Sequence, residues 1–401
     1  MSIMNDWLHK YGSYGKNPDG SITRTGGTPI YYEVVQALRA EMDKLGMQTD
    51  VDAVGNLHGY LPGSDKDAKS IVIGSHLDTV ISGGMFDGML GVIGGMEVVR
   101  RLRESKTVLR HPVEVFGFDL EESSPLGGTF GSWCVTGMVD TSIEGFEKAL
   151  QSYGWNLQDV ASAKRDTSRF GCYLEYHIEQ GDYLDSHKLD IGAVSGIVGI
   201  VRYTVRAFGS SNHAGTTMMD NRRDALIAMC RLILASEKKA REISDTLVFT
   251  VGKISVLPGA ENVIPGECEA TFEFRHMDKA VTDAFFAAIQ AMAAEIKECE
   301  FTFTDNCAQY ATPCDPELIK TIDAVAGGMG ASHVVMPSGA GHDANAMAHS
   351  GVPIGMIFVP SVAGISHHGK EWTDERHVDM GAEVLYRTCL LYTSPSPRDA
   401  T

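Results

Sequence analysis

The alternation of apolar and polar positions divides the chain into helices and strands. Residues 31–46, YYEVVQALRAEMDKLG, have the spacing of an amphipathic helix and end in a glycine. In contrast, SIVIGS at 70–75 and PVEVFGFD at 112–119 are short apolar runs typical of buried strands. Helices and strands alternate in this way up to about Gly192, which predicts a largely parallel sheet covered on both faces.

The pattern changes between residues 193 and 305. This stretch predicts strand, helix, two strands, helix and strand, at 199–209, 222–243, 247–257, 267–276, 281–298 and 300–305. Such a βαββαβ order fits a small sheet with two helices on one face. The first pattern returns from Pro316, so we expect an α/β fold in which residues 1–192 and 306–390 form one mainly parallel-sheet domain and 193–305 an inserted domain. The polar stretch 391–401 is expected to be a disordered tail or a sequence scar.

Composition excludes several classes of partner. The chain has 401 residues, with 34 Lys and Arg against 52 Asp and Glu, and it contains no basic run. A nucleic-acid or anionic-membrane partner is therefore not expected. The N-terminus lacks the features of a secretory signal, and no apolar stretch approaches the roughly 20 residues of a membrane span, so we expect a cytoplasmic protein. The eight cysteines include no CxxC pair, which suits unpaired thiols.

Polar residues follow the first buried strand in quick succession. The segment 71–88, IVIGSHLDTVISGGMFDG, presents His76, Asp78 and Asp87. His76 and Asp78 leave the same face of the strand, and a carboxylate that accepts the far ring N–H orients a histidine for a metal ion. Asp87 follows a Gly-rich turn. By itself it is either the N-cap of the next helix or a metal ligand, and the sequence leaves both open.

Two adjacent acids follow the second buried strand. Glu121 and Glu122 would point in different directions near a strand end, so that one can bind metal while the other faces water or substrate. This is the arrangement of a metal ligand beside a general base. A solvated acidic turn is the alternative.

Two later segments supply histidines. CYLEYHIEQ, at 172–180, places Glu175, His177 and Glu179 on one alternating face, and His367 and His368 follow the apolar run 354–359. Four residues would then lie at the carboxyl ends of strands in one parallel sheet, where open α/β sheets bind ligands: His76, Glu122, His177 and His367. Asp87 would lie in the nearest loop, and its two carboxylate oxygens could bridge two ions.

Other candidate residues have less distinctive settings. Arg275 ends a strand and could bind a substrate carboxylate or form a surface ion pair. His213 could stabilise an oxyanion or simply occupy a turn. The turn SGAGHDA, which contains Gly341, His342 and Asp343, could hold an anion on its backbone or cap a helix.

Nine short motifs occur in this chain in the order found in a known family. They are GSHLDTV, GGMFDG, EES, EYHIEQG, HAGTTMM, ENVIPG, FEFRH, SGAGHDA and GISHHGKE. Over nearly its whole length the chain resembles the M20-type metallo-amidohydrolases, in particular their hydantoinase/carbamoylase group. The resemblance implies two divalent ions, bound by His76, Asp87 and His177 and by Asp87, Glu122 and His367, with Asp87 bridging. It also implies that Glu121 is the general base, that the inserted domain forms a homodimer, and that substrate is contacted by Gln180, His213, Asn262 and Arg275.

The resemblance and the residues together predict the reaction. Mixed histidine and carboxylate ligation suits zinc, manganese, cobalt or nickel. His177 stands where peptidase relatives tend to have a carboxylate, which favours a small ureido or carbamoyl acid over a peptide. We expect hydrolysis of an N-carbamoyl-L-amino acid, with allantoate or ureidoglycolate as alternatives, and further alternatives of a dipeptidase, an aminoacylase or a non-catalytic binding protein. The chain departs from the family at three places. The segment 121–130, EESSPLGGTF, stands where the family often has Glu-Glu-Gly-Ser-Arg-Phe, Met218 stands where proline is usual, and His368 where a small or amide residue is common.

Overall fold

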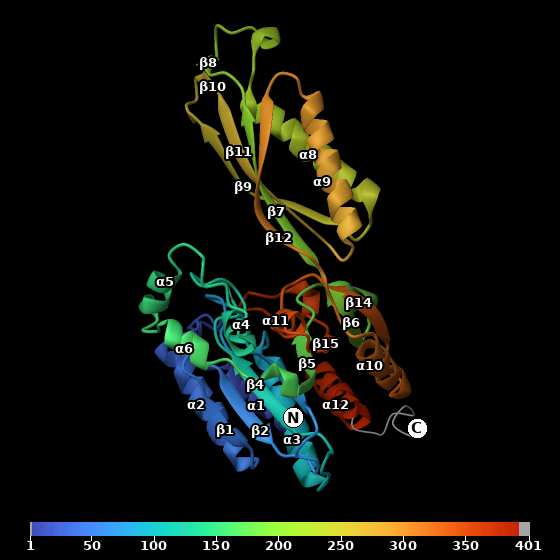
Figure 1. Ribbon diagram of the computed structural model, residues 1–401. Helices are drawn as coiled ribbons and strands as arrows, with labels where there is room; N and C mark the ends of the chain where they lie inside the picture. Colours follow the sequence, from blue (N-terminus) through green and yellow to red (C-terminus); the bar gives the residue numbers. More distant parts are fainter. Residues whose placement is uncertain (1, 123, 393–401) are drawn as a thin grey trace. The chain divides into compact units, whose positions relative to one another are not determined.

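The computed structural model describes residues 2–122 and 124–392. They form two compact units (Figure 1): the first contains the chain up to Ser195 and again from Pro313, and the second is Gly196–Thr312. Residue 123 and residues 393–401, which include most of the expected tail, lie outside the described part. The last helix, α12 (Glu375–Tyr392), includes the first two residues of the stretch 391–401.

The first unit is built on a mixed nine-stranded sheet with the main order β1-β2-β4-β3-β5-β15-β6-β13, in which β14 also pairs with β6. The four central strands, β4, β3, β5 and β15, are parallel, whereas β1, β2 and β6 add antiparallel pairs beside them. The strands are β1 (Gln48–Val51), β2 (Leu57–Leu61), β3 (Ser70–His76), β4 (Val113–Phe118), β5 (Phe170–Ile178), β6 (Ile191–Ile197), β13 (Thr312–Pro313), β14 (His333–Ser338) and β15 (Ile354–Val359).

Long amphipathic helices share one hydrophobic core with this sheet. They are α1 (Ile3–Gly12), α2 (Pro29–Lys44), α3 (Met89–Glu104), α10 (Pro316–Gly328) and α12. Of these, α3 and α12 pack on the central strands. The short helices α4 (Phe130–Thr136), α5 (Phe146–Ser152) and α6 (Leu157–Ser162) contribute to a separate cluster, while α11 (Ala344–His349) packs on β5 and β15; α7 (Tyr183–His187) follows β5.

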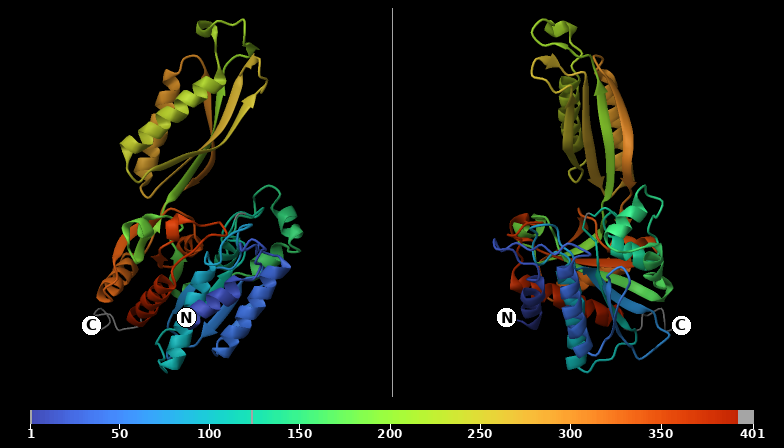
Figure 2. Two further views of the ribbon diagram at one scale, coloured as in Figure 1. Left: turned by 180° about the vertical axis from the view of Figure 1, so that it is seen from behind. Right: turned by 90° about the vertical axis from the view of Figure 1, so that its left-hand side faces the viewer.

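The second unit has a four-stranded antiparallel sheet of order β12-β7-β11-β9, with two helices on one face (Figure 2). Its elements are β7 (Gly199–Phe208), β8 (Asn212–His213), α8 (Ala225–Ile243), β9 (Val248–Leu257), β10 (Val263–Ile264), β11 (Glu267–His276), α9 (Lys279–Glu295) and β12 (Glu300–Gln309). The predicted βαββαβ order is confirmed. The pairing of β8 with β10 was not predicted, and β12 continues past the predicted end at Asp305. The expected α/β fold class is therefore confirmed.

A buried histidine, His58, links three neighbouring strands at one edge of the nine-stranded sheet, β1, β2 and β4. The ring nitrogens of His58 on β2 lie 2.8 Å from Asp50 Oδ1 and 2.7 Å from Glu114 Oε2. Both carboxylates accept, so the imidazole satisfies both only when it is protonated. Burial by itself lowers the pKa of His58, but hydrogen bonds to Asp50 and Glu114 raise it above its ordinary value.

Two composition-based expectations can be checked directly. All eight cysteines are unpaired thiols, as expected. Among residues 2–122 and 124–392, no helix is both long and apolar enough to span a lipid bilayer.

Candidate metal centre

The parallel strands deliver a set of histidines and carboxylates to one end of the sheet. His76 is the last residue of β3, and Asp87 lies just before α3. Glu121 and Glu122 follow β4, His177 is near the end of β5, and His367 follows β15. The carboxyl ends of neighbouring parallel strands meet at one edge, which explains why residues so distant in sequence converge.

Asp87 is the centre of this set. Its Oδ1 lies 3.1 Å from His177 Nε2 and 3.4 Å from His76 Nε2, while its Oδ2 lies 3.1 Å from His367 Nε2. The same His367 nitrogen is 3.4 Å from Glu122 Oε1. Two groups with ligand atoms within 4.8 Å of one another thus share Asp87: one with His76 and His177, the other with Glu122 and His367.

The protonation of the two buried histidines can be deduced from their neighbours. His76 Nδ1 lies 3.0 Å from the carbonyl oxygen of Asp78, and His177 Nδ1 lies 2.8 Å from that of Ile178. A carbonyl oxygen can only accept, so each Nδ1 carries hydrogen. In the neutral rings both Nε2 atoms then direct lone pairs toward Asp87; that of His177 also accepts from the N–H of Gly88, at 3.2 Å.

This arrangement fits a cation. Asp87 Oδ1 is buried and makes no hydrogen bond within the described part of the chain. An unpartnered carboxylate oxygen facing two lone pairs is unfavourable unless positive charge lies between them. A mixed set of imidazole nitrogens and carboxylate oxygens suits zinc and related divalent transition metals. The residues therefore fit metal ions.

The cap alternative for Asp87 is wrong. Helix α3 begins at Met89 with Gly88 as its N-cap, and no side chain caps it. Gly88 has φ of 65°, and a Cβ there would lie 2.5 Å from the His76 ring. Only glycine therefore allows the chain to turn this close to the ring.

Asp78 acts on the acidic pair more directly than on the histidine ring. Its Oδ1 accepts the N–H of Glu121 and its Oδ2 that of Glu122, each at 3.1 Å. The sequence led us to expect that this carboxylate would accept the far ring N–H of His76. That N–H instead donates to the Asp78 carbonyl, and the distance from His76 Nδ1 to Asp78 Oδ1 is 3.6 Å.

The pKa values of the site reflect burial and crowding of like charge. Burial raises the pKa of Glu121 well above its ordinary value; His76 opposes this rise, while Asp343, Glu122 and Asp78 add to it. Burial is also the main cause that raises the pKa of Glu122 to about 7. The pKa of His367 is raised to about 9, chiefly by its hydrogen bond to Asp87. Without a cation, Glu121 and Glu122 are thus costly to ionise together.

Gln180 also lies at the site. Its side-chain Nε2 donates to Asp87 Oδ2 at 3.1 Å and is 3.4 Å from His367 Nε2. Three residues here have positive φ: Leu120 at 53°, Gln180 at 63° and His367 at 54°. Non-glycine residues in this conformation are uncommon and cluster at functional sites.

Neither neighbour of His177 on the β5 face serves as a free acid. Glu175 accepts from the Ser75 hydroxyl at 2.7 Å and from the N–H of Ala344 at 2.9 Å. Glu179 accepts from the backbone of Tyr183 and Leu184 instead. Both carboxylates hold neighbouring backbone in place.

Sequence reasoning assigned no role to Arg24, which is fully buried. Its Nε donates to the Leu77 carbonyl at 2.6 Å, and its Nη1 donates to Tyr14 at 2.8 Å and to Gly12 at 3.2 Å. Arg24 therefore braces the segment between His76 and Asp78. Its partners are backbone carbonyls, which leave no pattern in the sequence.

Three predicted substrate residues lie in the second unit, and two, Gln180 and Gly341, lie in the first. His213 on β8 pairs with Val263, next to Asn262, whose carbonyl accepts from Ala214. Arg275 on β11 forms an ion pair of 2.7 Å with Glu273, the alternative that the sequence left open. Gly341 precedes α11, whose N-cap Asp343 makes no side-chain cap hydrogen bond, so the helix-cap alternative for this turn is wrong.

Comparisons with known proteins agree with this geometry. Residues 72–391 match the model of "Peptidase family M20/M25/M40". The chain is 35% identical over 393 residues to N-carbamoyl-L-amino acid amidohydrolase of Geobacillus stearothermophilus, covering 95% of this chain and 96% of that one. It is 34% identical over 392 residues to allantoate amidohydrolase of Escherichia coli K12, covering 94% of each.

Solved structures give the same result. A crystal structure of an amidase of the hydantoinase/carbamoylase family from Burkholderia multivorans superposes with a TM-score of 0.88 at 30% identity, over 98% of this chain and 97% of that one. The shared length and fold, together with the candidate metal ligands of this chain, leave one conclusion. This chain belongs to the M20 peptidase family and, within it, to the hydantoinase/carbamoylase group of amidohydrolases, which act on C–N bonds other than peptide bonds.

Proposed function

We propose that this enzyme hydrolyses an N-carbamoyl-L-amino acid to the amino acid, carbon dioxide and ammonia. The observation that carries the proposal is the pair of ligand groups that share Asp87, with His177 as a ligand and the Gln180 amide beside them. A side-chain amide can hydrogen-bond a planar carbamoyl group, whose oxygen accepts and whose nitrogens donate. The named activity of the Geobacillus relative supports the same substrate class.

We propose that the site binds two divalent ions of zinc, manganese, cobalt or nickel. His76, Asp87 and His177 would hold one, and Asp87, Glu122 and His367 the other. When bound, such ions lower the pKa of water and polarise a carbonyl oxygen.

Glu121 would be the general base. Its Oε2 is 3.8 Å from His76 Nε2, so it lies beside the proposed ligands without being the nearest partner of any of them. The carboxylate takes a proton from the attacking water and passes it to the nitrogen that leaves when the C–N bond breaks. Asp78 holds the backbone N–H groups of both acids and so keeps the base and the ligand Glu122 in fixed relation.

We propose further substrate contacts at the residues that the resemblance implies. Arg275 would exchange its partner Glu273 for the substrate carboxylate, since a guanidinium binds a carboxylate through two parallel hydrogen bonds. His213 would stabilise the developing oxyanion, and Asn262 and the backbone near Gly341 would add further polar contacts.

Allantoate and ureidoglycolate are the second candidates. The Escherichia coli relative is named an allantoate amidohydrolase, at 34% identity against 35% for the Geobacillus protein, so identity does not separate the two. All these substrates combine a ureido group with a carboxylate, which the same Gln180 and Arg275 would bind.

A substrate panel tests the proposal. Purified enzyme would be assayed with N-carbamoyl amino acids, allantoate, ureidoglycolate, N-acetyl amino acids and dipeptides, each with manganese, cobalt, nickel and zinc. We expect the highest kcat/KM on an N-carbamoyl-L-amino acid. Preference for a dipeptide or an N-acetyl substrate would overturn the carbamoylase assignment, and metal binding without any hydrolysis would favour a binding protein.

We also propose a homodimer formed by the second unit. Its edge strand β9 and its helix α8 expose apolar side chains, among them Leu234 at 71% and Leu257 at 57%. Exposed apolar residues at a sheet edge and on a helix commonly mark an interface. Light scattering should give twice the mass of 43.4 kDa, and a strict monomer at micromolar concentration would refute the dimer.

A further inference from the structure

Glu371 is a buried carboxylate that connects two segments of the candidate metal centre. Its Oε1 accepts from the backbone N–H of Phe86 at 2.9 Å and from that of Asp87 at 3.1 Å. Its Oε2 accepts from the hydroxyl of Ser366, the residue before His367, at 3.1 Å. One side chain thus touches both the segment that carries Asp87 and the segment that carries His367.

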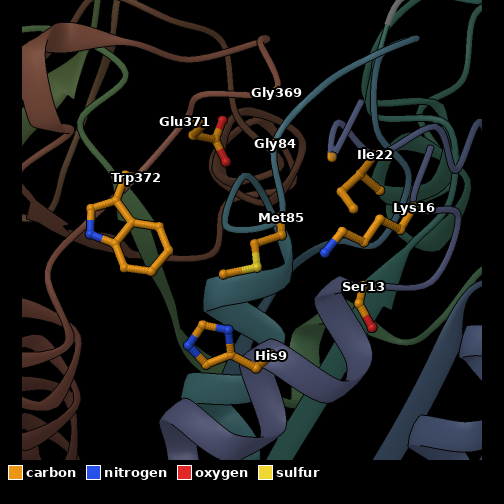
Figure 3. A pocket seen from close by; sticks show the side chains of 10 residues that line it. His9, Ser13, Lys16, Ile22, Gly84, Met85, Gly369, Glu371 and Trp372 are labelled. Carbon is orange, nitrogen blue, oxygen red and sulfur yellow. The ribbon is translucent and has the colours of Figure 1, made fainter. Parts of the chain in front are cut away.

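The chain packs very closely around this carboxylate. A Cβ on Gly84 would lie 2.1 Å from Glu371 Oε1, so the loop before Asp87 folds directly over it. Figure 3 shows Glu371 near Gly84. Both residues line a cavity of ≈ 250 Å³, together with Met85 and Trp372. The Ser366 hydroxyl is also 3.2 Å from Asp87 Oδ2. The three residues form one connected network.

The charge of Glu371 is not balanced locally. Its side chain is buried, with 5% exposure, and it forms no ion pair with any residue in the described part of the chain. Asp87, a second buried carboxylate, belongs to the segment whose N–H groups Glu371 accepts from. Two buried acids side by side are costly unless positive charge compensates them. A cation on Asp87 would supply that charge.

We propose that Glu371 is a positioning residue of the metal centre: it fixes Asp87 and the His367 segment relative to each other and thereby sets metal affinity. The inference rests on the proposed metal centre. Partners of metal ligands hold the ligand geometry, and their loss typically reduces metal affinity or activity about 10- to 100-fold.

Metal titration of the apoenzyme tests this directly. Manganese and zinc affinities would be measured by competition with a chromophoric chelator for the full chain and for Glu371→Ala and Glu371→Gln. The alanine variant should bind metal about 10- to 100-fold more weakly. Glutamine keeps an amide oxygen that accepts from both N–H groups, so it should restore most of the affinity.

Asp315→Ala is the matched control. The Asp315 carboxylate also accepts from two backbone N–H groups, those of Glu317 and Leu318, at 2.9 and 3.0 Å, but it caps α10. Its loss should leave metal affinity unchanged. This comparison separates a role at the metal centre from a general effect of losing a carboxylate that accepts from two backbone N–H groups.

Turnover gives a second readout. In Glu371→Ala the metal concentration for half-maximal activity should rise about as much as the metal Kd, while KM stays near wild type and excess metal restores most of kcat. Unchanged metal affinity, or a loss of kcat that excess metal does not restore, would overturn the proposal. Metal binding is read without substrate, so a wrong substrate assignment leaves this result intact.

A second variant covers the case in which Glu371→Ala fails to fold. Gly84→Ala forces the loop away from Glu371 without removing the carboxylate and should also weaken metal binding. Gly328→Ala adds the same methyl group where nothing lies within 4 Å. Equal metal affinity in the two glycine variants would refute the positioning role.

Discussion

Replacing Glu121 by glutamine separates the two roles proposed for the adjacent acids. The substitution keeps the size of the side chain and leaves the backbone N–H bonded to Asp78 Oδ1, at 3.1 Å, untouched. It removes only the group that takes up the proton. Loss of a general base typically costs about 10²- to 10⁴-fold in rate, which corresponds to about 3 to 5 kcal/mol of transition-state stabilisation.

Metal content should respond differently from rate. Glu121 Oε2 lies 3.8 Å from His76 Nε2, whereas Asp87 has three histidine nitrogens at 3.1 to 3.4 Å. Glu121→Gln should therefore keep wild-type metal content. Asp87→Ala and His76→Ala should lose metal together with activity.

The assay is elemental analysis of dialysed protein beside steady-state kinetics on the same samples. Glu122→Gln is the internal comparison, because its carboxylate lies 3.4 Å from His367 Nε2 and is a proposed ligand. If Glu121→Gln loses as much metal as Glu122→Gln, Glu121 is a ligand and the assignment of the base is wrong. If it keeps both metal and full turnover, another group is the base.

Three further variants probe separate features of the structure. Gly88→Ala should lower metal affinity, and the positive φ alone should cost about 1 to 3 kcal/mol of stability. Gly20→Ala controls for the backbone effect, because Gly20 has φ of 90° but a Cβ there would meet nothing within 4 Å. Equal metal affinity in the two variants would refute the steric argument. The folded pKa of His58 is raised, so its contribution to stability is complete below about pH 6.5 and is lost as pH rises through the folded value. The melting temperature of wild type should accordingly fall more steeply than that of His58→Gln above neutral pH, and parallel pH profiles would contradict the charged state. Arg275→Ala should raise KM at least about tenfold and lower kcat through misplacement of the scissile bond, whereas Arg206→Ala, which breaks an ion pair with Glu269 in the same sheet, should leave both unchanged.

The position of the candidate ligands could be predicted because it follows from topology. His76, Glu122, His177 and His367 each come after an apolar run recognisable as a strand, and parallel strands present their carboxyl ends at one edge. The long helices could also be predicted from the sequence, since their apolar spacing repeats over several turns, as in α2 and α8. Short helices such as α4, with seven residues, carry too few turns for a periodic signal.

The supporting contacts could not be predicted because their partners are backbone atoms. Glu371 binds the N–H groups of Phe86 and Asp87 across nearly 300 residues, and Arg24 binds carbonyl oxygens. Neither contact requires a particular side chain at its partner position. The positive φ of Leu120 and His367 is also invisible in the sequence, since no glycine marks either position.

Asp78 shows how one residue can place two others in different roles. Its two oxygens each take one N–H from the consecutive residues Glu121 and Glu122, so the backbone of both is held by a single buried carboxylate. Fixing the two N–H groups fixes the points from which the two carboxylates extend. Glu122 Oε1 lies 3.4 Å from His367 Nε2, and Glu121 Oε2 lies 3.8 Å from His76 Nε2. In the proposed roles, the difference between ligand and base arises from backbone geometry and not from the identity of the side chains, which is why only paired metal and rate measurements on both glutamine variants can distinguish them.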